Sequence, residues 1–214
     1  MVRLIEADNI SEAWLKGCEC IINYGFRTKR KIKLHNLIAE IKNITLDKYI
    51  DEQFRNYMNL RIFKRTLDIV SSDQNLNSHP NYWRRLKGKE EFKIDQVARV
   101  ISRLRKQPHS TKLTLCIYSP NDFKKMYTPC ILCAELRVNK RRLNMTAFIR
   151  SQDFANKSYA DYIGLSSILK RIGENSNIKP GAILTHTITA FIAYKDLSRM
   201  KSFLNIIREK KISN

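Results

Sequence analysis

Residues 128–154 read TPCILCAELRVNKRRLNMTAFIRSQDF and carry the clearest structural pattern in the chain. Within this stretch, apolar and polar side chains alternate over Ile131–Val138, which is typical of a β-strand with one buried face. Asn139-Lys140 then signals a tight turn, and Leu143–Ile149 repeats the alternation. The stretch therefore predicts a β-hairpin of two neighbouring antiparallel strands.

The segments on either side of this hairpin show both helical and strand patterns. Apolar residues recur at helical spacing in residues 10–23, 47–70, 94–105, 161–172 and 197–207. Further strand-forming residues concentrate in residues 32–41, 112–118 and 182–193, and the last of these follows a Pro180-Gly181 turn. Because helices and strands are mixed along the chain, we predict an α+β fold with a mixed β-sheet flanked by helices, in a single domain over residues 1–214.

The chain is strongly basic. Forty Lys and Arg residues stand against twenty Asp and Glu, which gives a formal net charge of +20. The basic residues form short runs, such as residues 27–33, and aromatic side chains including Phe26 and Trp83 lie beside them, as on many nucleic-acid-binding surfaces. The charge predicts weak, non-specific nucleic-acid binding, and a solvated lysine-rich surface is the alternative.

The five cysteines are scattered, so a disulfide framework would be unusual in a chain of this length. Cys18, Cys20, Cys130 and Cys133 are poorly spaced for zinc, and we expect no metal site. Buried free thiols are the simpler interpretation for Cys18, Cys20 and Cys116.

The first residues, MVRLIEADN, lack the charged-then-apolar layout of a signal peptide. No apolar run approaches the roughly 20 residues that a membrane helix needs. We therefore expect no membrane association, and the cytoplasm is the default location.

Three segments then occur in a characteristic order. TPCILCAELRV places a Pro-Cys dipeptide before a strand, RLNMTAFIRSQDF ends a strand in Arg-Ser-x-Asp, and a helix at Asp161 precedes IKPGAILTHTITAF. Earlier segments agree in order, namely SEAWLKG, RTKR, YWRRL, IDQVARVISRL and PHSTK. Together they span nearly the whole chain and resemble the thymidylate synthase family, most closely its short archaeal branch.

The resemblance implies the α+β thymidylate synthase fold and a homodimer formed through sheet faces. It also implies that the Cys130 thiolate adds to C6 of a pyrimidine nucleoside monophosphate, which makes C5 a nucleophile. C5 then takes the one-carbon unit of methylene-tetrahydrofolate, or of a methanopterin analogue in an archaeal host. A thiolate requires a lowered pKa, which nearby arginines would supply. A plain buried thiol is the alternative for Cys130.

The same resemblance implies an anion site for the 5′-phosphate. Arg150 would bind the phosphate through two nitrogens, and Ser151 would add a hydrogen bond. Arg27 would converge on the same ion, with Lys112 arriving from the partner subunit. Asp153 would order the pterin or its waters. A salt bridge between Arg150 and Asp153 is the structural alternative.

Asp161 stands where typical members carry an asparagine that recognises uracil. A carboxyl group accepts a hydrogen bond from the cytosine amine and, when protonated, donates one to N3, whereas an ionised carboxylate repels O4 of uracil. This is the residue that dCMP hydroxymethylases of the family carry. The alternative is that Asp161 only caps a helix.

Other positions depart from the family pattern. The usual arginine pair is replaced by Thr111 and Lys112, and the His-x-Tyr that holds the sugar aligns on Phe191 and Ala193. Tyr194 is one place away, which would point it to the other side of a strand. Glu52 is only a weak candidate for the catalytic glutamate.

We therefore predict C5 one-carbon transfer to a pyrimidine nucleotide, with hydroxymethylation of a cytidylate (dCMP or CMP) ahead of dUMP methylation. A catalytically degenerate homologue that binds nucleic acid through its basic surface is the alternative of a different class. The missing arginine pair and His-x-Tyr favour that alternative, whereas Cys130 together with Arg150 opposes it.

Overall fold

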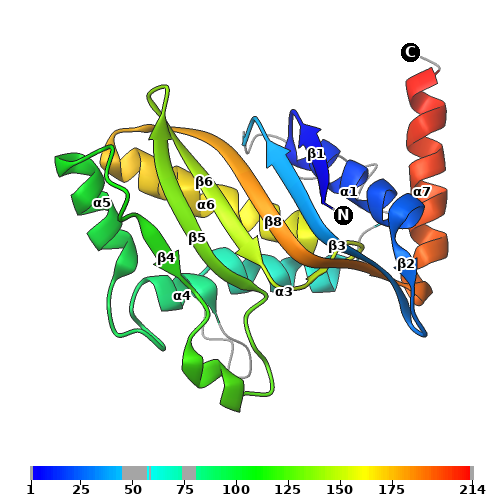
Figure 1. Ribbon diagram of the computed structural model, residues 1–214, viewed down its shortest axis with the longest axis horizontal. Helices are drawn as coiled ribbons and strands as arrows, with labels where there is room; N and C mark the ends of the chain where they lie inside the picture. Colours follow the sequence, from blue (N-terminus) through cyan, green and yellow to red (C-terminus); the bar gives the residue numbers. More distant parts are fainter. Residues whose placement is uncertain (1, 45–56, 58, 74–80, 213–214) are drawn as a thin grey trace.

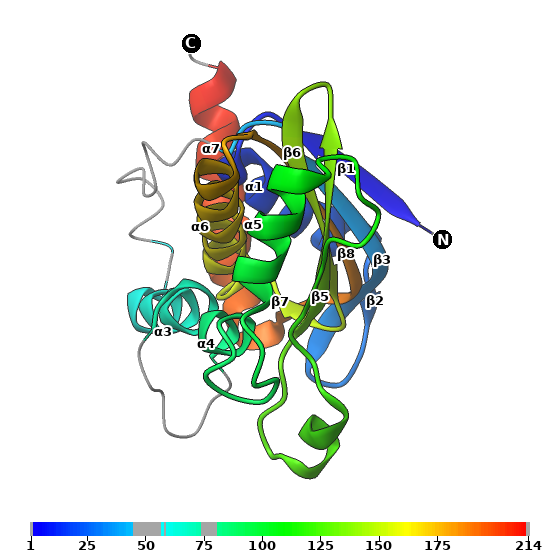
Figure 2. The same ribbon diagram turned by 90° about the vertical axis from the view of Figure 1, so that its left-hand side faces the viewer.

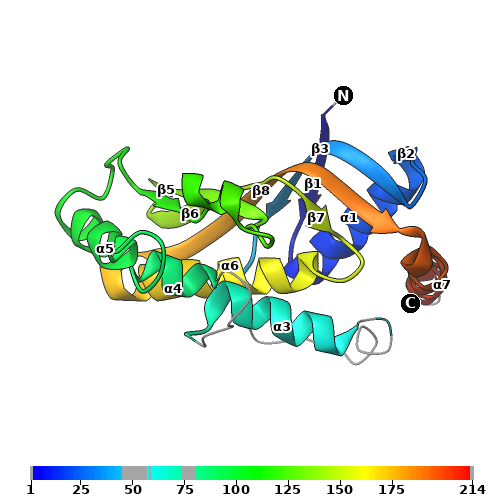
Figure 3. The same ribbon diagram turned by 90° about the horizontal axis from the view of Figure 1, so that it is seen from below.

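A computed structural model of the chain describes residues 2–44, 57, 59–73 and 81–212. An eight-stranded mixed sheet crosses the molecule, and the α-helices of the described residues pack on one of its faces (Figures 1 and 2). The other face carries no α-helix in that part of the chain, as the view from below shows (Figure 3). This arrangement confirms the α+β class and the mixed sheet.

The strands are β1 (Arg3–Ala7), β2 (Phe26–Arg27), β3 (Lys31–Ile41), β4 (Thr114–Cys116), β5 (Ile131–Asn139), β6 (Arg142–Ile149), β7 (Gln152–Asp153) and β8 (Lys179–Ala193). Their order across the sheet is β1-β3-β8-β6-β5-β4, with β2 added to β3 and β7 added to β8. The helices are α1 (Ile10–Tyr24), α3 (Leu60–Ser71), α4 (Tyr82–Leu86), α5 (Gln96–Lys106), the 3₁₀ helix η1 (Pro120–Lys124), α6 (Ser158–Ser176) and α7 (Tyr194–Ile212).

The predicted hairpin is present as β5 and β6, which pair antiparallel. Asn139 pairs with Arg142, so the two turn residues are Lys140 and Arg141, one position later than the sequence indicated. Both turn residues have positive φ, 48° and 60°, which is the backbone conformation of a two-residue type I′ turn. That turn matches the right-handed twist of the strands and sets their register.

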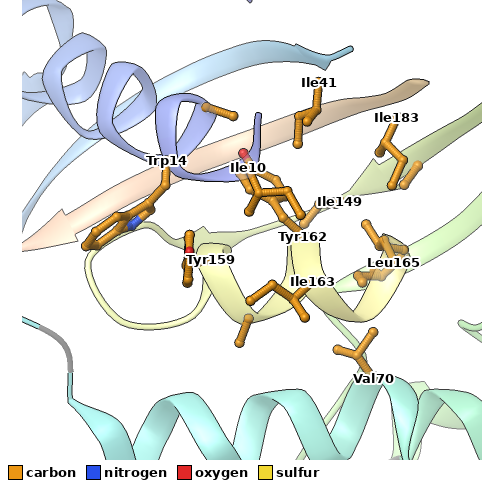
Figure 4. Close-up of a cluster of buried hydrophobic side chains, with 14 of the residues drawn as sticks. Ile10, Trp14, Ile41, Val70, Ile149, Tyr159, Tyr162, Ile163, Leu165 and Ile183 are labelled. Atoms are coloured by element: carbon orange, nitrogen blue, oxygen red, sulfur yellow. The ribbon is translucent and has the colours of Figure 1, made fainter. Parts of the chain in front are cut away.

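Helix α6 forms the centre of the core (Figure 4). It is buried on all sides up to Ser166 because it lies between the sheet and α3, and further along it exposes Lys170, Arg171, Glu174 and Asn175. Gly164 permits the close approach of α3, since a Cβ at this position would lie 2.4 Å from Val70 Cγ1. Trp14 of α1 joins the same core and donates from Nε1 to the Phe154 carbonyl at 2.6 Å.

Several helices and strands begin or end at other residues than the sequence predicted. Much of the helix predicted over residues 47–70 lies outside the described residues, and the described helix begins at Leu60. Pro180 and Gly181 lie inside β8 and form no turn, because β8 already pairs with β6 from Lys179 onward. Tyr194 is the first residue of α7, so the alternation expected for a strand does not apply to it.

Neither a membrane-spanning helix nor a metal-binding cluster occurs in the described part of the chain. None of its helices is long and apolar enough to cross a bilayer. No group of three or more His, Cys, Asp or Glu side chains there could hold a metal ion.

Candidate active site

The β5–β6 hairpin brings the Pro-Cys and Arg-Ser-x-Asp motifs together. Ile131, at the start of β5, pairs with Ile149, at the end of β6, so Cys130 and Arg150 are adjacent. The Arg150 amide donates to the Cys130 carbonyl at 2.9 Å. The antiparallel pairing therefore places the candidate nucleophile beside the candidate phosphate ligand, although 20 residues separate them in the sequence.

The Arg150 side chain holds the segment before Cys130. Its Nε donates to the Pro129 carbonyl at 2.8 Å, and its Nη2 donates to the Thr128 carbonyl and hydroxyl at 3.2 and 2.6 Å. The salt bridge to Asp153 considered above does not form. Nη1 makes no hydrogen bond to the described residues, which leaves one face of the guanidinium for an anion.

Tyr82 of α4 contacts the backbone of Cys130. The Cys130 amide donates to the Tyr82 hydroxyl at 2.9 Å, and the Tyr82 ring is buried within α4. Burial raises the pKa of this phenol, and the negative charges of Cys130 and Asp161 raise it further. The hydroxyl of Tyr82 is therefore close to both candidate catalytic groups.

The pKa of Cys130 is raised, which is opposite to the expectation from the sequence. Burial is the largest cause, and the charge of Asp161 adds to it. Arg150 and Lys157 lower the pKa of the thiol, but they do not overcome the first two effects. The reason is local, since the Arg150 guanidinium is directed toward carbonyl oxygens of residues 128 and 129. In the protein alone, the thiol is the stable form.

Asp161 is not a helix cap, so that alternative is wrong. The N-cap of α6 is Lys157, and Asp161 follows in the first turn with only 5% of its surface exposed. Gln152 Nε2 donates to Asp161 Oδ2 at 3.0 Å, and Gln152 Oε1 accepts from the Thr187 hydroxyl at 2.9 Å. Burial raises the pKa of Asp161 to about 6. The chain thus holds a carboxyl that protonates near neutral pH in a fixed orientation.

Asp153 belongs to a second polar network. Asn156 Nδ2 donates to Asp153 Oδ2 and to Asp196 Oδ2, both at 3.0 Å, and Arg199 donates to Asn156 Oδ1 and Asp196 Oδ1. Burial raises the pKa of Asp153, and the nearby charge of Asp196 raises it further. Asp153 Oδ1 is buried with no hydrogen-bond partner in the described part of the chain. A buried acceptor without a partner is suited to a donor from a ligand.

The remaining predicted residues do not all meet here. Ser151 is half-buried directly after Arg150. Arg27 is exposed on β2, and Lys112 lines a groove beside α5. No contact among the described residues joins either of these side chains to Cys130 or Arg150. Phe191 lies beside Asp153 in the β7–β8 pairing and has Lys31 Nζ 3.8 Å above its ring. Glu52 lies outside the described residues.

Three site residues were missed in the sequence: Tyr82, Gln152 and Thr187. All three stand inside segments already singled out, YWRRL, Arg-Ser-x-Asp and IKPGAILTHTITAF, in which none of these three residues had been assigned a role in the site. Thr187 is one of four threonines or histidines in the THTIT run of β8, and only the sheet pairing identifies it.

The family model for thymidylate synthase matches residues 21–211. A relative from Methanosarcina mazei, named "Putative thymidylate synthase", is 26% identical over 208 residues, which covers 94% of each chain. A protein of the same name from Methanothermobacter marburgensis is 26% identical over 206 residues, which covers 88% of this chain and 92% of the relative.

A bacterial thymidylate synthase, from Phytoplasma mali, is 31% identical over 107 residues, which covers 50% of this chain and 35% of the relative. The family match extends over both motifs of the β5–β6 hairpin and over α6 and β8, which together build the site. The chain belongs to the thymidylate synthase family.

Proposed function

We propose that this protein transfers a one-carbon unit to C5 of a pyrimidine nucleoside monophosphate, with Cys130 as nucleophile and a cytidylate as substrate. The observation that carries the choice of base is the position of Asp161. Its carboxyl is buried, is oriented by Gln152, and is close enough to raise the pKa of the Cys130 thiol.

Cys130 begins the reaction as a thiolate. Its sulfur adds to C6 of the ring, and the electron pair of the C5–C6 bond moves to C5, which becomes the carbon nucleophile. The family implies a folate-type donor, which supplies the one-carbon unit when bound. Asp153 Oδ1, buried and without a partner in the described residues, suits the N–H donors of a pterin. Water supplies the hydroxyl of the hydroxymethyl group, C5 loses its proton, and the C6–sulfur bond breaks, which restores the ring and releases the Cys130 thiolate.

The 5′-phosphate of the nucleotide would bind next to Cys130, at Arg150. Arg150 holds the Thr128–Pro129 backbone and keeps Nη1 available, so a dianionic phosphate can bind beside it through charge-assisted hydrogen bonds. Ser151 adjoins this position. We place Arg27 of the same chain and Lys112 of the partner subunit as further phosphate ligands.

The base would be selected by hydrogen-bond complementarity. Asp161 Oδ2 accepts from Gln152, while Oδ1 makes no hydrogen bond within the described residues. With its pKa raised to about 6, this carboxyl can hold a proton that it donates to cytosine N3 while accepting from the N4 amine. Uracil offers O4 at the place of the amine, and an ionised carboxylate would repel it.

Methylation of dUMP is the second candidate, because the relatives named above are thymidylate synthases or carry that name. The two candidates share Cys130 and differ in the base. Purified protein should be incubated with C5-tritiated dCMP, CMP and dUMP, with and without methylene-tetrahydrofolate, and tritium release recorded. We expect release from the cytidylates above that from dUMP; the reverse order would establish the second candidate.

Covalent trapping tests the nucleophile separately. A 5-fluoropyrimidine nucleotide with the folate should give an adduct on the intact protein by mass spectrometry. Cys130→Ser should abolish the adduct, and the matched variant Cys133→Ser should retain it. Adduct formation by the Cys130→Ser protein would exclude Cys130. If neither adduct nor tritium release is detected with any nucleotide, the degenerate homologue is the correct interpretation.

A further inference from the structure

Cys116 and Cys133 lie directly opposite each other on adjacent antiparallel strands. Cys116 ends β4, Cys133 is the third residue of β5, and the two are register partners in the pairing of these strands. Both are free thiols; Cys116 is exposed and Cys133 is half-buried. The proposed chemistry at Cys130 uses neither of them.

Both side chains project from the sheet face that carries no α-helix in the described residues. On β5, Ala134 and Leu136 are buried toward the helices, so Cys133 and Glu135 alternate to the other face. On β4, Leu115 is buried, and Cys116 therefore shares the face of Cys133. Two residues along and on the same face, the Thr114 hydroxyl donates to its register partner Glu135, which shows that the side chains of opposite residues meet here.

The hydrogen-bond pattern shows how close the two backbones are. Ile117 N donates to Leu132 O at 2.9 Å, and Leu136 N donates to Leu113 O at 3.1 Å. Hydrogen-bonded pairs recur at every second position of an antiparallel ladder, and Cys116 with Cys133 is one position from the hydrogen-bonded Ile117–Leu132 pair, so it is of the non-hydrogen-bonded kind. Such pairs have Cα atoms about 4.5 Å apart, which lies within the range of about 4.4–6.8 Å that a disulfide spans.

We propose that Cys116 and Cys133 form an intrachain, cross-strand disulfide when the protein meets a peroxide. The geometry carries this inference, which is independent of the nucleotide chemistry at Cys130. The pair lies at the margin of the open face because β4 is the edge strand of the sheet. Cys116 therefore stays at the rim when a second copy covers the central strands, and a small oxidant can reach it first.

The reaction balances with hydrogen peroxide as the oxidant. The Cys116 thiolate attacks one peroxide oxygen, the O–O bond breaks, and the thiol becomes a sulfenic acid while hydroxide leaves and is protonated to water. The Cys133 thiolate then attacks the Cys116 sulfur, the S–O bond breaks, and a second hydroxide leaves as water. Two thiols are oxidised by two electrons, and one peroxide is reduced to two waters.

Burial and the neighbouring Cys116 and Glu135 raise the pKa of Cys133. Cys133 is consequently the slower nucleophile at neutral pH, which suits the resolving step, because that step is intramolecular. A peroxide-treated Cys133→Ser protein should therefore accumulate a sulfenic acid on Cys116 that a dimedone probe captures.

The test is peptide mapping of the full-length protein after peroxide treatment, alkylation with N-ethylmaleimide and digestion without reductant. We expect the loss of two alkylatable thiols and a linked peptide pair joining Cys116 to Cys133, reversed by dithiothreitol. Cys116→Ser and Cys116→Ala should both lose the link with unchanged far-ultraviolet circular dichroism, since the position is exposed.

Cys130→Ser is the matched control, because Cys130 and Cys133 form a C-x-x-C that could oxidise instead. The link should persist in that variant. A link between Cys130 and Cys133, or one between two chains on a non-reducing gel, would overturn the proposal. A dithiol peptide added to the same tube shows whether the peroxide is active. If that peptide is oxidised while Cys116 and Cys133 remain fully alkylatable, the proposal is also overturned.

Discussion

At the scale of single residues, Asp161 is the position that separates the two enzyme candidates. A binding site that hydrogen-bonds the exocyclic amine of cytosine leaves buried polar atoms unpaired when it binds uracil, which has an exocyclic oxygen instead. The unpaired atoms cost about 1–3 kcal/mol of binding free energy. Asp161→Asn should therefore move the ratio of tritium release on dCMP to that on dUMP toward dUMP by about ten- to a hundredfold. An unchanged ratio would mean that Asp161 does not contact the base.

The same substitution has a second, independent readout at Cys130. The Asp161 charge raises the pKa of the thiol and is present above pH 6, so removing it should lower that pKa. The rate of Cys130 alkylation by iodoacetamide, followed from pH 7 to 10, should rise at lower pH in Asp161→Asn than in the wild type. Lys157→Gln should shift the profile the other way, because Lys157 lowers the pKa of Cys130.

The site residues differ in how far the sequence could predict them. Cys130 and Arg150 were predicted from the family pattern and Asp161 from a departure from it, and the structure brings all three to one place. The contacts of Arg150 could not be predicted, because its partners are backbone carbonyls that carry no sequence signal. The raised pKa of Cys130 was missed for a related reason: burial is its largest cause, and burial depends on how the whole chain packs.

At the scale of elements, the periodicity of apolar residues was sufficient to predict helices and strands whose contacts are local in the sequence. Helix α1 was predicted over residues 10–23 and runs from Ile10 to Tyr24, and the β5–β6 hairpin was predicted with its turn displaced by one residue. β1, β2 and β7 were missed. β1 pairs parallel with β3 across a helix, and β2 and β7 have two residues each, too few to show alternation. Long-range partners decide such strands, so local pattern cannot reveal them.

A buried ion pair joins two elements around the site. Arg85 of α4 donates to both carboxylate oxygens of Asp122 in η1, at 2.7 and 2.8 Å, and both side chains are almost fully buried. Helix α4 carries Tyr82, which accepts a hydrogen bond from the Cys130 amide, and η1 precedes Cys130 in the chain. The ion pair therefore holds α4 and the segment before Cys130 in a fixed relative position.

Removing Asp122 leaves the buried Arg85 guanidinium without its hydrogen-bonded carboxylate, and Glu90 Oε2, 3.6 Å from Nε, remains as a weaker counter-ion. Asp122→Asn should therefore lower the free energy of unfolding by about 3–5 kcal/mol, measured in urea at pH 7. Asp73→Asn is the matched control, because the Asp73–Lys89 pair is exposed, and it should cost less than about 1 kcal/mol. Equal losses of unfolding free energy in the two variants would show that the buried Arg85–Asp122 pair stabilises the fold no more than the exposed pair does.

At the scale of the whole molecule, the open sheet face is the feature most in need of a partner. Ile38, His186, Phe148 and Cys133 are successive register partners across β3, β8, β6 and β5, and they form one row on that face. Phe148 and Ile188 expose 37% and 43% of their surface there. We propose that a second copy of the chain covers this face in a homodimer, as the fold expected from the sequence implies.

The dimer is testable by sedimentation. A charge buried without a partner opposes association, so Phe148→Asp should convert a dimer into a monomer at micromolar concentration. Phe123→Asp is the control, since Phe123 is 82% exposed on η1, away from the sheet, and it should leave the dimer intact. A monomeric wild type would contradict the proposal and, with it, any phosphate contact from the partner's Lys112.

The net charge of +20 is a property of the whole molecule, and some of the basic side chains that produce it line a groove that could bind an anionic ligand. A groove of about 840 Å³ beside α5 is lined by Arg99, Arg103, Lys106, His109 and Lys112 among other residues, and none of its described lining residues is acidic. By contrast, Lys31 in the basic run of residues 27–33 already lies over the Phe191 ring.

Such a groove attracts phosphates without reading sequence, so binding of single-stranded DNA should be weak and steeply salt-dependent. Each phosphate contact contributes about 0.7 to the slope of log K against log salt on single strands. Arg99→Gln with Arg103→Gln should thus reduce the slope by up to about 1.4, equally for unrelated sequences, in fluorescence anisotropy titrations between 50 and 200 mM salt.

Lys16→Gln is the control for those titrations, because Lys16 pairs with Glu12 on α1 and is not a lining residue of this groove. If binding is absent at about 50 mM salt, where counterion release favours it most, the groove does not recruit polyanions, and the charge serves solvation alone. A slope that falls equally in Lys16→Gln would instead assign the attraction to the net charge and not to the groove.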